Sequence, residues 1–338
     1  MKAIATRGAR DIDQTGAFEE IELDCPTPDS LDALVHIEAI SVNPVDTKVR
    51  AGALGEIEEP TILGWDVVGT IVSMGDEVRG FSEGDRVYYS GEVTRPGCNA
   101  EYQLIDTRLI AHAPKTLDIE EIAALPLTAL TAWEALFDKL RLTRDANAHT
   151  DETLLIINGA GGVGSIAIQL ARQLTGLRVI ATASRDQSVQ WCRDMGAHDV
   201  VDHHDLINEM KKLGLEQADY IFNCHDIGVH WDNMVSLIRP LGDIVAIAET
   251  KQQVDLNALQ GKAASFHWEF MFARPLHNVQ RDAQGQALTA MATLFDEGKL
   301  RSTLGEIVGP LSVDNLTRAH RMLEEGHTIG KLVLTAIR

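Results

Sequence analysis

The sequence predicts an α/β protein of two domains, one rich in short strands and one built on a doubly wound parallel sheet. Over roughly the first 125 residues, short runs of Val, Ile and Tyr are separated by glycine and proline, which is typical of antiparallel strands. From residue 153 onward, strand-like and helix-like segments alternate, and that order predicts parallel strands with right-handed crossovers. A length of 338 residues, at about 150 residues per domain, agrees with two domains.

The first domain is expected to be mostly antiparallel, because its β-like runs are short and end at turn pairs such as Gly75-Asp76 and Gly84-Asp85. These runs occupy residues 34–42, 64–74, 84–90 and 100–106. In residues 114–140 the apolar positions fall three and four apart, so we expect a long helical region with a break near Pro126.

The second domain begins with residues 153–158, a continuous apolar run expected of a parallel strand covered on both faces. Helical spacing in residues 165–174 and 188–196 places helices on either side of a second strand at 178–183. Three more strands are expected at residues 199–204, 219–224 and 242–248. The chain then continues into two amphipathic helices and a last strand, at residues 287–298, 315–326 and 331–337.

Composition excludes several classes of function. With 30 Lys and Arg against 50 Asp and Glu, the net charge of −20 disfavours nucleic acid or an anionic membrane surface as partner. No apolar run approaches a membrane span and the first residues lack a signal-peptide pattern, so we expect a cytoplasmic protein. The four cysteines, none in a C-x-x-C pair, indicate neither a disulfide framework nor a four-cysteine zinc site; they are Cys25, Cys98, Cys192 and Cys224.

A glycine-rich loop directly follows the first strand of the second domain. The loop reads G-x-G-x-x-G and leads straight into a helix; its residues are Gly159, Ala160, Gly161, Gly162, Val163 and Gly164. In this strand-turn-helix setting the backbone can approach a pyrophosphate, and the helix N-terminus offers N–H groups and partial positive charge. We therefore expect a dinucleotide here; the alternative is a plain glycine-rich turn that binds nothing.

The residues after the second strand concern the choice of cofactor. Where an NAD-binding domain carries an acid for the ribose 2′-hydroxyl, this chain has Ser184 and Arg185. An arginine can form a forked pair with a 2′-phosphate, so NADPH is predicted. The alternative is a solvated arginine beside Asp186, which would leave the choice open.

Two further groups of residues lie at the ends of later strands. His198, Asp199, Asp202, His203 and His204 are close in sequence, but a strand would point successive side chains to opposite faces, so we expect no metal site. Cys224 precedes His225 and His230 at the carboxyl end of a strand, where it either lines an adenosine pocket or packs as an apolar side chain.

Longer stretches of the chain carry a family resemblance. TRPGCNAEYQL (94–104), TAWEALF (131–137) and HWEFMFARP (267–275), together with the glycine loop, resemble the medium-chain dehydrogenase/reductase superfamily. Within it the chain is similar to the quinone oxidoreductase branch, and most of all to zinc-type alcohol dehydrogenase-like proteins. The resemblance implies a GroES-like catalytic domain from residues 1–126 and 278–338, and a six-stranded Rossmann domain binding NADP(H) over 127–277. It also implies a homodimer formed by pairing the last Rossmann strand, within residues 264–272.

The same resemblance argues against zinc. Zinc-dependent members of the superfamily bind a catalytic metal through Cys, His and Cys, and the matching positions here are Asn43, Trp65 and Leu127. None is a competent ligand in that role, because Trp and Leu offer no lone pair and an amide replaces a thiolate poorly. The four-cysteine structural zinc loop is missing too, with Cys98 alone in that region. No zinc is expected.

The predicted function is hydride transfer from NADPH to a quinone or another conjugated carbonyl, without zinc. Lacking a Lewis acid, the site is poorly suited to oxidise a simple alcohol. A conjugated acceptor needs only a hydride, hydrogen-bond donors and a proton. The alternatives are a 2-alkenal or enoyl reductase, a crystallin-like protein that binds NADPH without catalysis, and a metal-dependent dehydrogenase using ligands such as the His203 cluster.

The resemblance also assigns site residues. Asn43 and Asp46 are expected beside the nicotinamide and substrate, and Arg95 and Arg274 at the rim of the cleft. Cofactor contacts are expected from Thr131, Phe272 and Arg274, with Phe272 as a wall of the nicotinamide pocket.

Each of these assignments has a structural alternative. Asn43 could form a turn with Pro44 and Asp46 could cap the following helix, while Phe272 could be a core residue and Arg274 an ion-pair partner. Several relatives have Tyr where this chain has Lys48, which leaves the polarity of the substrate pocket open.

Overall fold

The computed structural model describes residues 1–338 except 15, 54, 56–59 and 338, and the chain forms two compact units. One, called the terminal unit here, comprises Met1–Leu127 and Phe272–Arg338; the other, the central unit, is Thr128–Met271. Phe272 and Arg274, expected among the cofactor-binding residues, belong by their contacts to the terminal unit. Within the described ranges, no helix has the length and hydropathy that crossing a membrane requires.

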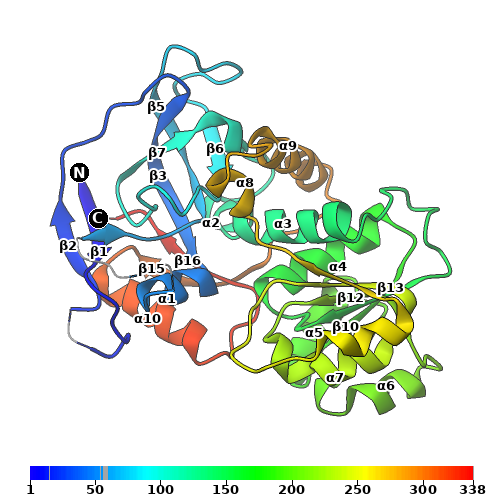
Figure 1. The fold of residues 1–338 in the computed structure, drawn as a ribbon. Coiled ribbons are helices and arrows are strands. Elements are labelled where there is room, and N and C mark those ends of the chain that lie inside the picture. The colour runs from blue at the N-terminus through cyan, green and yellow to red at the C-terminus, as the bar shows by residue number, and fades with distance from the viewer. Residues whose placement is uncertain (15, 54, 56–59, 338) are drawn as a thin grey trace. The chain divides into compact units, whose positions relative to one another are not determined.

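The central unit contains the predicted doubly wound sheet (Figure 1). As described, its six strands are all parallel and lie in the order β11 (Asp199–Val201), β10 (Arg178–Thr182), β9 (Thr153–Ile157), β12 (Ala218–Asn223), β13 (Ile238–Ala246) and β14 (Ser265–Trp268). The sheet order 3-2-1-4-5-6 reverses direction between β9 and β12, and ligands of such sheets bind at this switch point.

Helices connect these strands: α4 (Gly162–Leu174), α5 (Asp186–Asp194), α6 (Leu206–Lys212) and α7 (Ile227–Leu237). β9 is buried at every position, as its continuous apolar run predicts. Met210 of α6 and Trp231 of α7 pack with Leu155 and Ile221 of the sheet in one apolar core. That core fixes the carboxyl ends of the strands, where the glycine loop begins.

One predicted strand is wrong in its length. The segment expected as a strand over residues 199–204 leaves the sheet after Val201, and a 3-10 turn follows at His203–Asp205. Asp202 causes the change, because its side chain accepts a hydrogen bond from the His204 N–H at 2.9 Å and so starts the turn. The two histidines therefore do not point to opposite faces of a strand.

The terminal unit is mostly antiparallel, as predicted. Across the described part of the chain, its larger sheet runs in the order β15 (Leu304–Pro310), β16 (Lys331–Thr335), β3 (Asp32–Val42), β5 (Val67–Met74), β6 (Arg86–Tyr89) and β8 (Ala111–His112), with β7 (Tyr102–Asp106) also paired to β3. A smaller sheet has the order β2 (Glu19–Glu22), β1 (Lys2–Thr6) and β4 (Thr61–Ile62). The last strand, β16, lies antiparallel to β3, so the end of the chain closes the sheet begun near its start.

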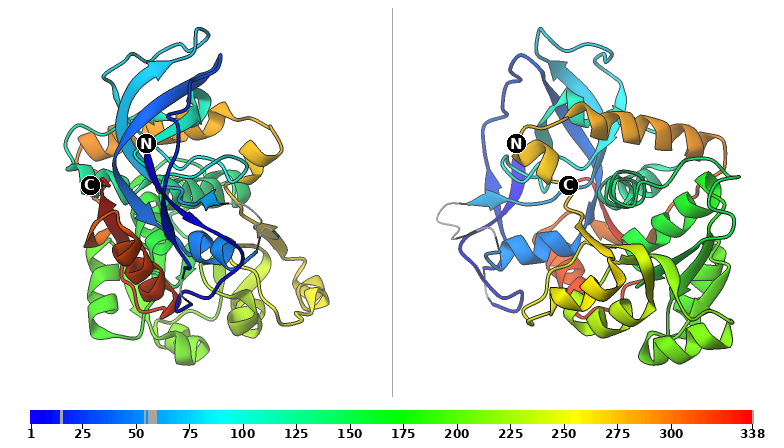
Figure 2. Two further views of the ribbon diagram at one scale, coloured as in Figure 1. Left: turned by 90° about the vertical axis from the view of Figure 1, so that its left-hand side faces the viewer. Right: turned by 45° about the vertical axis from the view of Figure 1, so that its right-hand side comes forward.

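The helices described wholly within this unit are α1 (Pro44–Arg50), α2 (Ile119–Ala123), α8 (Ala273–Leu276), α9 (Asp282–Asp296) and α10 (Val313–Glu324), of which α2, α9 and α10 pack on the larger sheet. α9 packs along β8 and the 3-10 turn Thr107–Leu109. It is the orange helix near the top of the right-hand view in Figure 2. The helical region expected at residues 114–140 is interrupted before Pro126, which begins α3 (Pro126–Trp133); a π-helical segment, Glu134–Lys139, follows. The predicted break near Pro126 is confirmed.

A buried histidine lies where α10 packs on α1. His320 is fully buried, its ring meets Phe18 edge to face with centroids 4.9 Å apart, and neither ring nitrogen makes a hydrogen bond among the described residues. Arg50, also buried, pairs with Glu324. Burial, aided by the charge of Arg50, lowers the pKa of His320 from 6.5 to about 3.

This histidine makes stability depend on pH. Because folding lowers the pKa of His320, the unfolded chain binds more protons below pH 6.5, and stability is lost as the pH falls from about 6.5 toward 3. The contribution of one proton is up to about 1.4 kcal/mol per pH unit. We expect His320→Leu to flatten the decline in unfolding free energy between pH 6.5 and 5, measured by urea denaturation. Equal slopes in wild type and variant would contradict this, and His277→Leu, at an exposed position, is the control.

Candidate functional site

The glycine loop of the central unit is held to the end of the neighbouring strand. After β9, Asn158 takes a left-handed conformation with φ of +65°, which asparagine tolerates better than most residues. Its N–H donates to Thr182 Oγ1 at 2.9 Å, and the Gly159 N–H donates to the Thr182 carbonyl at 3.1 Å. These bonds fix the path of the loop before the helix begins.

Two of the three motif glycines are required by close packing, and the third keeps the loop backbone accessible. A Cβ on Gly164 would lie 2.4 Å from the Asn158 carbonyl oxygen, and one on Gly159 would lie 2.7 Å from the Ala181 Cβ. Close packing of the helix and sheet on the loop therefore requires glycine at both ends. A Cβ on Gly161 would have only atoms of Asn158 as its nearest neighbours, the first at 3.1 Å. Glycine at that position leaves the loop backbone accessible, as a dinucleotide site needs.

The helix after the loop offers an anion-binding end. α4 begins at Gly162 with Gly161 as its N-cap, and the helical ladder starts with the Ser165 N–H donating to the Gly161 carbonyl at 2.9 Å. The N–H groups of the first turn have no carbonyl one turn earlier to bind, so they carry partial positive charge outward. These residues fit a pyrophosphate group without any further side chain.

The segment that would contact the 2′ position of the ribose follows β10. Ser184 and Arg185 are both exposed, and Arg185 is the residue before α5. The Ser188 hydroxyl accepts from the Arg185 N–H at 3.3 Å and donates to the Arg185 carbonyl at 2.8 Å, so the turn is fixed. The residue after Arg185 is an acid, Asp186, but it is the first residue of α5.

Two other predicted cofactor residues lie in the central unit. The Cys224 N–H donates to the Ile157 carbonyl at 3.1 Å, so Cys224 lies at the switch point beside the start of the glycine loop. Burial raises the pKa of its thiol well above the usual range, which keeps the sulfur protonated and unreactive at neutral pH. Thr131 lies on α3 and is buried.

The terminal unit contains a buried charged cluster that we call the Asp66 cluster: Ser41, Asn43, Asp66, Lys331 and the main-chain N–H of Leu127. The carboxylate of Asp66 accepts four hydrogen bonds. They come from Ser41 Oγ at 2.8 Å, Asn43 Nδ2 at 2.8 Å, Lys331 Nζ at 2.8 Å and the Leu127 N–H at 2.6 Å. Asp66 is fully buried and Lys331 is 4% exposed, so the two opposite charges compensate each other away from water.

The ammonium of Lys331 also has a full set of hydrogen-bond partners. Its three protons are directed to the Val42 carbonyl at 3.0 Å, the Asn43 side-chain oxygen and Asp66. Pairing of β16 with β3 sets Leu332 opposite Val42, and this register brings the lysine to the end of β3. The Asn43 amide is thus held between a carboxylate on its nitrogen side and a cation on its oxygen side.

Asp46 lies next to this cluster but is less completely bonded. One carboxylate oxygen accepts the Asn43 N–H, closing a capping box at the start of α1, and the structure confirms this capping role. The other oxygen is buried and has no hydrogen bond in the part of the chain described. Burial raises the pKa of Asp46 to about 7, against the lowering effects of the Asn43 N–H and Lys331. This carboxyl can gain or lose a proton near neutral pH.

The positions that match zinc ligands do not fit zinc. The Asn43 amide is used by Asp66 and Lys331, the Trp65 indole N–H donates to the Glu92 carbonyl at 3.1 Å, and Leu127 gives its backbone N–H to Asp66. None of the three side chains presents the thiolate or imidazole that tetrahedral zinc sites use. A protein cation, Lys331, is bound instead among the oxygens of Val42, Asn43 and Asp66.

The remaining predicted residues of the terminal unit are placed elsewhere in it. Arg95 forms a forked pair with Asp32, at 2.9 and 2.7 Å, and lies 3.8 Å from Glu92. Phe272 meets Trp65 edge to face with centroids 5.9 Å apart, and Arg274 donates to Gln280. A rim position for Arg95 and cofactor contacts for Phe272 and Arg274 stay predictions.

Sequence reasoning missed Asp66 and Lys331. A signal was present, because each is a lone charged residue beside an otherwise apolar run, in GWDVVG and GKLVLT. A charge in such a run is buried only when it is paired. Two such runs, one with a buried anion and one with a buried cation, are therefore expected to pair with each other.

Two family models and many known proteins match the chain. Residues 29–115 match the alcohol dehydrogenase GroES-like domain, and residues 195–334 match the family described as zinc-binding dehydrogenase. The chain is 43% identical over 336 residues to a zinc-type alcohol dehydrogenase-like protein of Staphylococcus epidermidis, covering 99% of each chain.

Solved structures share the fold. A Rhizobium etli protein provisionally described as a zinc-dependent alcohol dehydrogenase has a TM-score of 0.94 and 40% identity, covering 100% of this chain and 98% of that one. Quinone oxidoreductase of Escherichia coli, crystallised with NADPH, has a TM-score of 0.84 and 23% identity, covering 99% and 100%. The second likeness concerns the fold alone.

The Asp66 cluster predicts a strong energetic coupling. Lys331→Met leaves a carboxylate without its cation, and Asp66→Asn leaves a buried ammonium without its anion, so each is expected to cost about 3–5 kcal/mol of unfolding free energy. The double variant removes both charges and should cost less than the sum by about 1–3 kcal/mol, measured by urea denaturation.

The exposed pair of Arg318 and Glu306, 2.8 Å apart, is the matched control. For Arg318→Met with Glu306→Gln, the coupling should stay below about 1 kcal/mol. Additive effects of the two substitutions at Lys331 and Asp66 would contradict the interpretation.

Proposed function

Because the chain belongs to the medium-chain dehydrogenase/reductase superfamily, we propose that it is an NADPH-dependent reductase of quinones or other conjugated carbonyls, as in the quinone oxidoreductase branch of that superfamily. The observation that carries the proposal is the Asp66 cluster, in which two of the three positions that match zinc ligands, Asn43 and Leu127, donate hydrogen bonds to a carboxylate that is paired with Lys331. A reaction whose acceptor is already electrophilic fits a site of this kind.

The cofactor proposal rests on the central unit. NADPH, when bound, supplies a hydride, and this chain's task is to hold and orient it. The glycine loop and the first turn of α4 are proposed to bind the pyrophosphate, with Ser184 and Arg185 at the 2′-phosphate. Thr131, Cys224, Phe272 and Arg274 are proposed as further contacts with the cofactor. The E. coli quinone oxidoreductase of the same fold was crystallised with NADPH, which supports this choice.

The proton proposal rests on Asp46. Reduction of a quinone by one hydride produces an anion that takes up one proton to give the hydroquinone, so a proton donor is required. Asp46 has a buried oxygen without a hydrogen bond among the described residues and a pKa raised to about 7, and we propose that it donates this proton. Asn43, held by Asp66 and Lys331, is proposed to orient Asp46 through its N–H, and Arg95 to lie at the rim.

The partner proposal concerns a second copy of the chain. β14 is an edge strand with an unpaired side, since it pairs with β13 alone in the described sheet. Trp268 at its end is 48% exposed and Phe270 just after it is 43% exposed. Edge strands with aromatic side chains pair readily, so a homodimer through β14 is proposed.

Steady-state kinetics with NADPH and NADH against a quinone panel and an enal panel tests the function. We expect turnover of a conjugated acceptor with NADPH, and a KM for NADPH at least about tenfold higher in Arg185→Ala, because a charge-assisted pair with phosphate is lost. The KM for NADH should hardly change. Arg193→Ala, also exposed and on α5, is the control. Absence of turnover in every arm would refute the function, and equal effects on both cofactors would refute the role of Arg185.

The pH profile tests Asp46. If the protonated carboxyl donates the proton, kcat/KM falls as the pH rises through about 7, and Asp46→Asn loses that limb together with most of the activity. General acid catalysis contributes about 10²–10⁴-fold, so a loss of that order is expected. Glu121→Gln changes the carboxylate that closes the capping box of α2, where it accepts the Asp118 N–H at 3.0 Å as Asp46 accepts that of Asn43, and should leave the profile unchanged. An unaltered alkaline limb in Asp46→Asn would exclude the assignment.

A further inference from the structure

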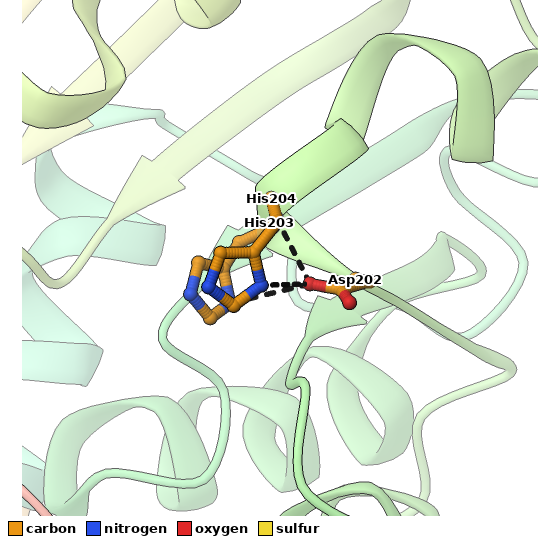
Figure 3. A group of neighbouring side chains, drawn as sticks. All are labelled: Asp202, His203 and His204. Carbon is orange, nitrogen blue, oxygen red and sulfur yellow. Dashed lines mark hydrogen bonds and ion pairs between the residues drawn. The ribbon is translucent and has the colours of Figure 1, made fainter.

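Metal-ligating side chains gather after β11 and β12 of the central unit, outside the residues used above. The turn after β11 brings together a carboxylate and two imidazoles, and two more imidazoles follow β12; the five residues are Asp202, His203, His204, His225 and His230. In Figure 3 both rings of the first pair lie on the same side of the turn and face the Asp202 carboxylate.

The first three residues already have the proximity of a ligand set. Asp202 Oδ1 lies 2.6 Å from His204 Nδ1 and 3.9 Å from His203 Nδ1. One potential ligand atom from each of the three lies within 4.8 Å of the others. Tetrahedral ligands at about 2.0–2.1 Å from a metal are ~3.3 Å apart. The rings of His203 and His204 are nearly stacked, with centroids 4.1 Å apart and planes at 32°, so binding one ion requires rotation of these half-exposed or exposed side chains.

A second observation points to a ligand in the same place. His230 is 4% exposed, and its Nδ1 has no hydrogen bond among the residues described. Its ring centroid lies 6.2 Å from that of His203 and 5.3 Å from that of His225.

We propose that Asp202, His203 and His204 bind one divalent transition-metal ion, with His230 as a neighbouring donor behind them. Two imidazoles and one carboxylate suit Zn²⁺, Co²⁺, Ni²⁺ or Cu²⁺, whereas Mg²⁺ and Ca²⁺ prefer oxygen ligands alone. This site is separate from the positions at Asn43, Trp65 and Leu127, and it does not depend on the proposed reductase function.

Metal binding by the untagged, metal-stripped full chain tests the proposal. Co²⁺ titration followed by visible absorption, and dialysis against Zn²⁺ followed by elemental analysis, should each give one ion per chain. His203→Gln with His204→Gln should abolish both signals, and Asp202→Asn, which keeps an oxygen to cap the turn, should weaken Co²⁺ binding at least about tenfold. His36→Gln with His277→Gln removes two exposed histidines elsewhere and should change neither signal.

Two results would refute the proposed metal site. Binding of Co²⁺ by the His203/His204 double variant as tightly as by wild type would refute the site, as would no binding by wild type beyond that of the double variant. Far-UV circular dichroism and thermal unfolding of the metal-free variants identify any loss that comes from misfolding. Because both histidines lie in a turn and are at least partly exposed, we expect these measurements to match wild type.

Discussion

The ion pair between Asp66 and Lys331 is the constraint on which the terminal unit depends. Two charges in a dry interior are tolerated only when each finds its full set of partners, because the loss of hydration of an ion costs several kcal/mol. Here the carboxylate has four donors and the ammonium three acceptors. The ends of β3 and β16 and the residues before β5 and after α2 are therefore fixed relative to one another, and Asn43 and Asp46 with them.

The net charge of −20 affects how an anionic cofactor would approach the protein. An anionic cofactor approaches such a chain against an unfavourable long-range field, so attraction must come from nearby features. The central unit offers them in the first turn of α4 and in the exposed Arg185. Lys331, by contrast, adds nothing at long range, because Asp66 neutralises it at 2.8 Å.

The sequence predicts most of the fold because burial leaves a local pattern. β9 shows it as a continuous apolar run, and the glycine loop shows it as three glycines, two of which the packing requires. β11 ends early because the Asp202 side chain accepts a backbone hydrogen bond that competes with pairing in the sheet. The alternation of apolar and polar residues, from which strands are predicted, carries no information about such a bond. The Asp66 cluster escaped prediction because its members lie up to 290 positions apart, from Ser41 to Lys331, and only the register of β16 on β3 unites them.

The pairing of β16 with β3 also sets an order of events during synthesis. Asn43 and Asp66 leave the ribosome early, but the lysine that balances their charge is residue 331, which follows the entire central unit. Domains generally fold as units while the chain is being made. The central unit can therefore fold before β16, the last strand of the terminal sheet, has been synthesised. Until Lys331 is present to pair with it, burying the Asp66 carboxylate is unfavourable, and it stays hydrated.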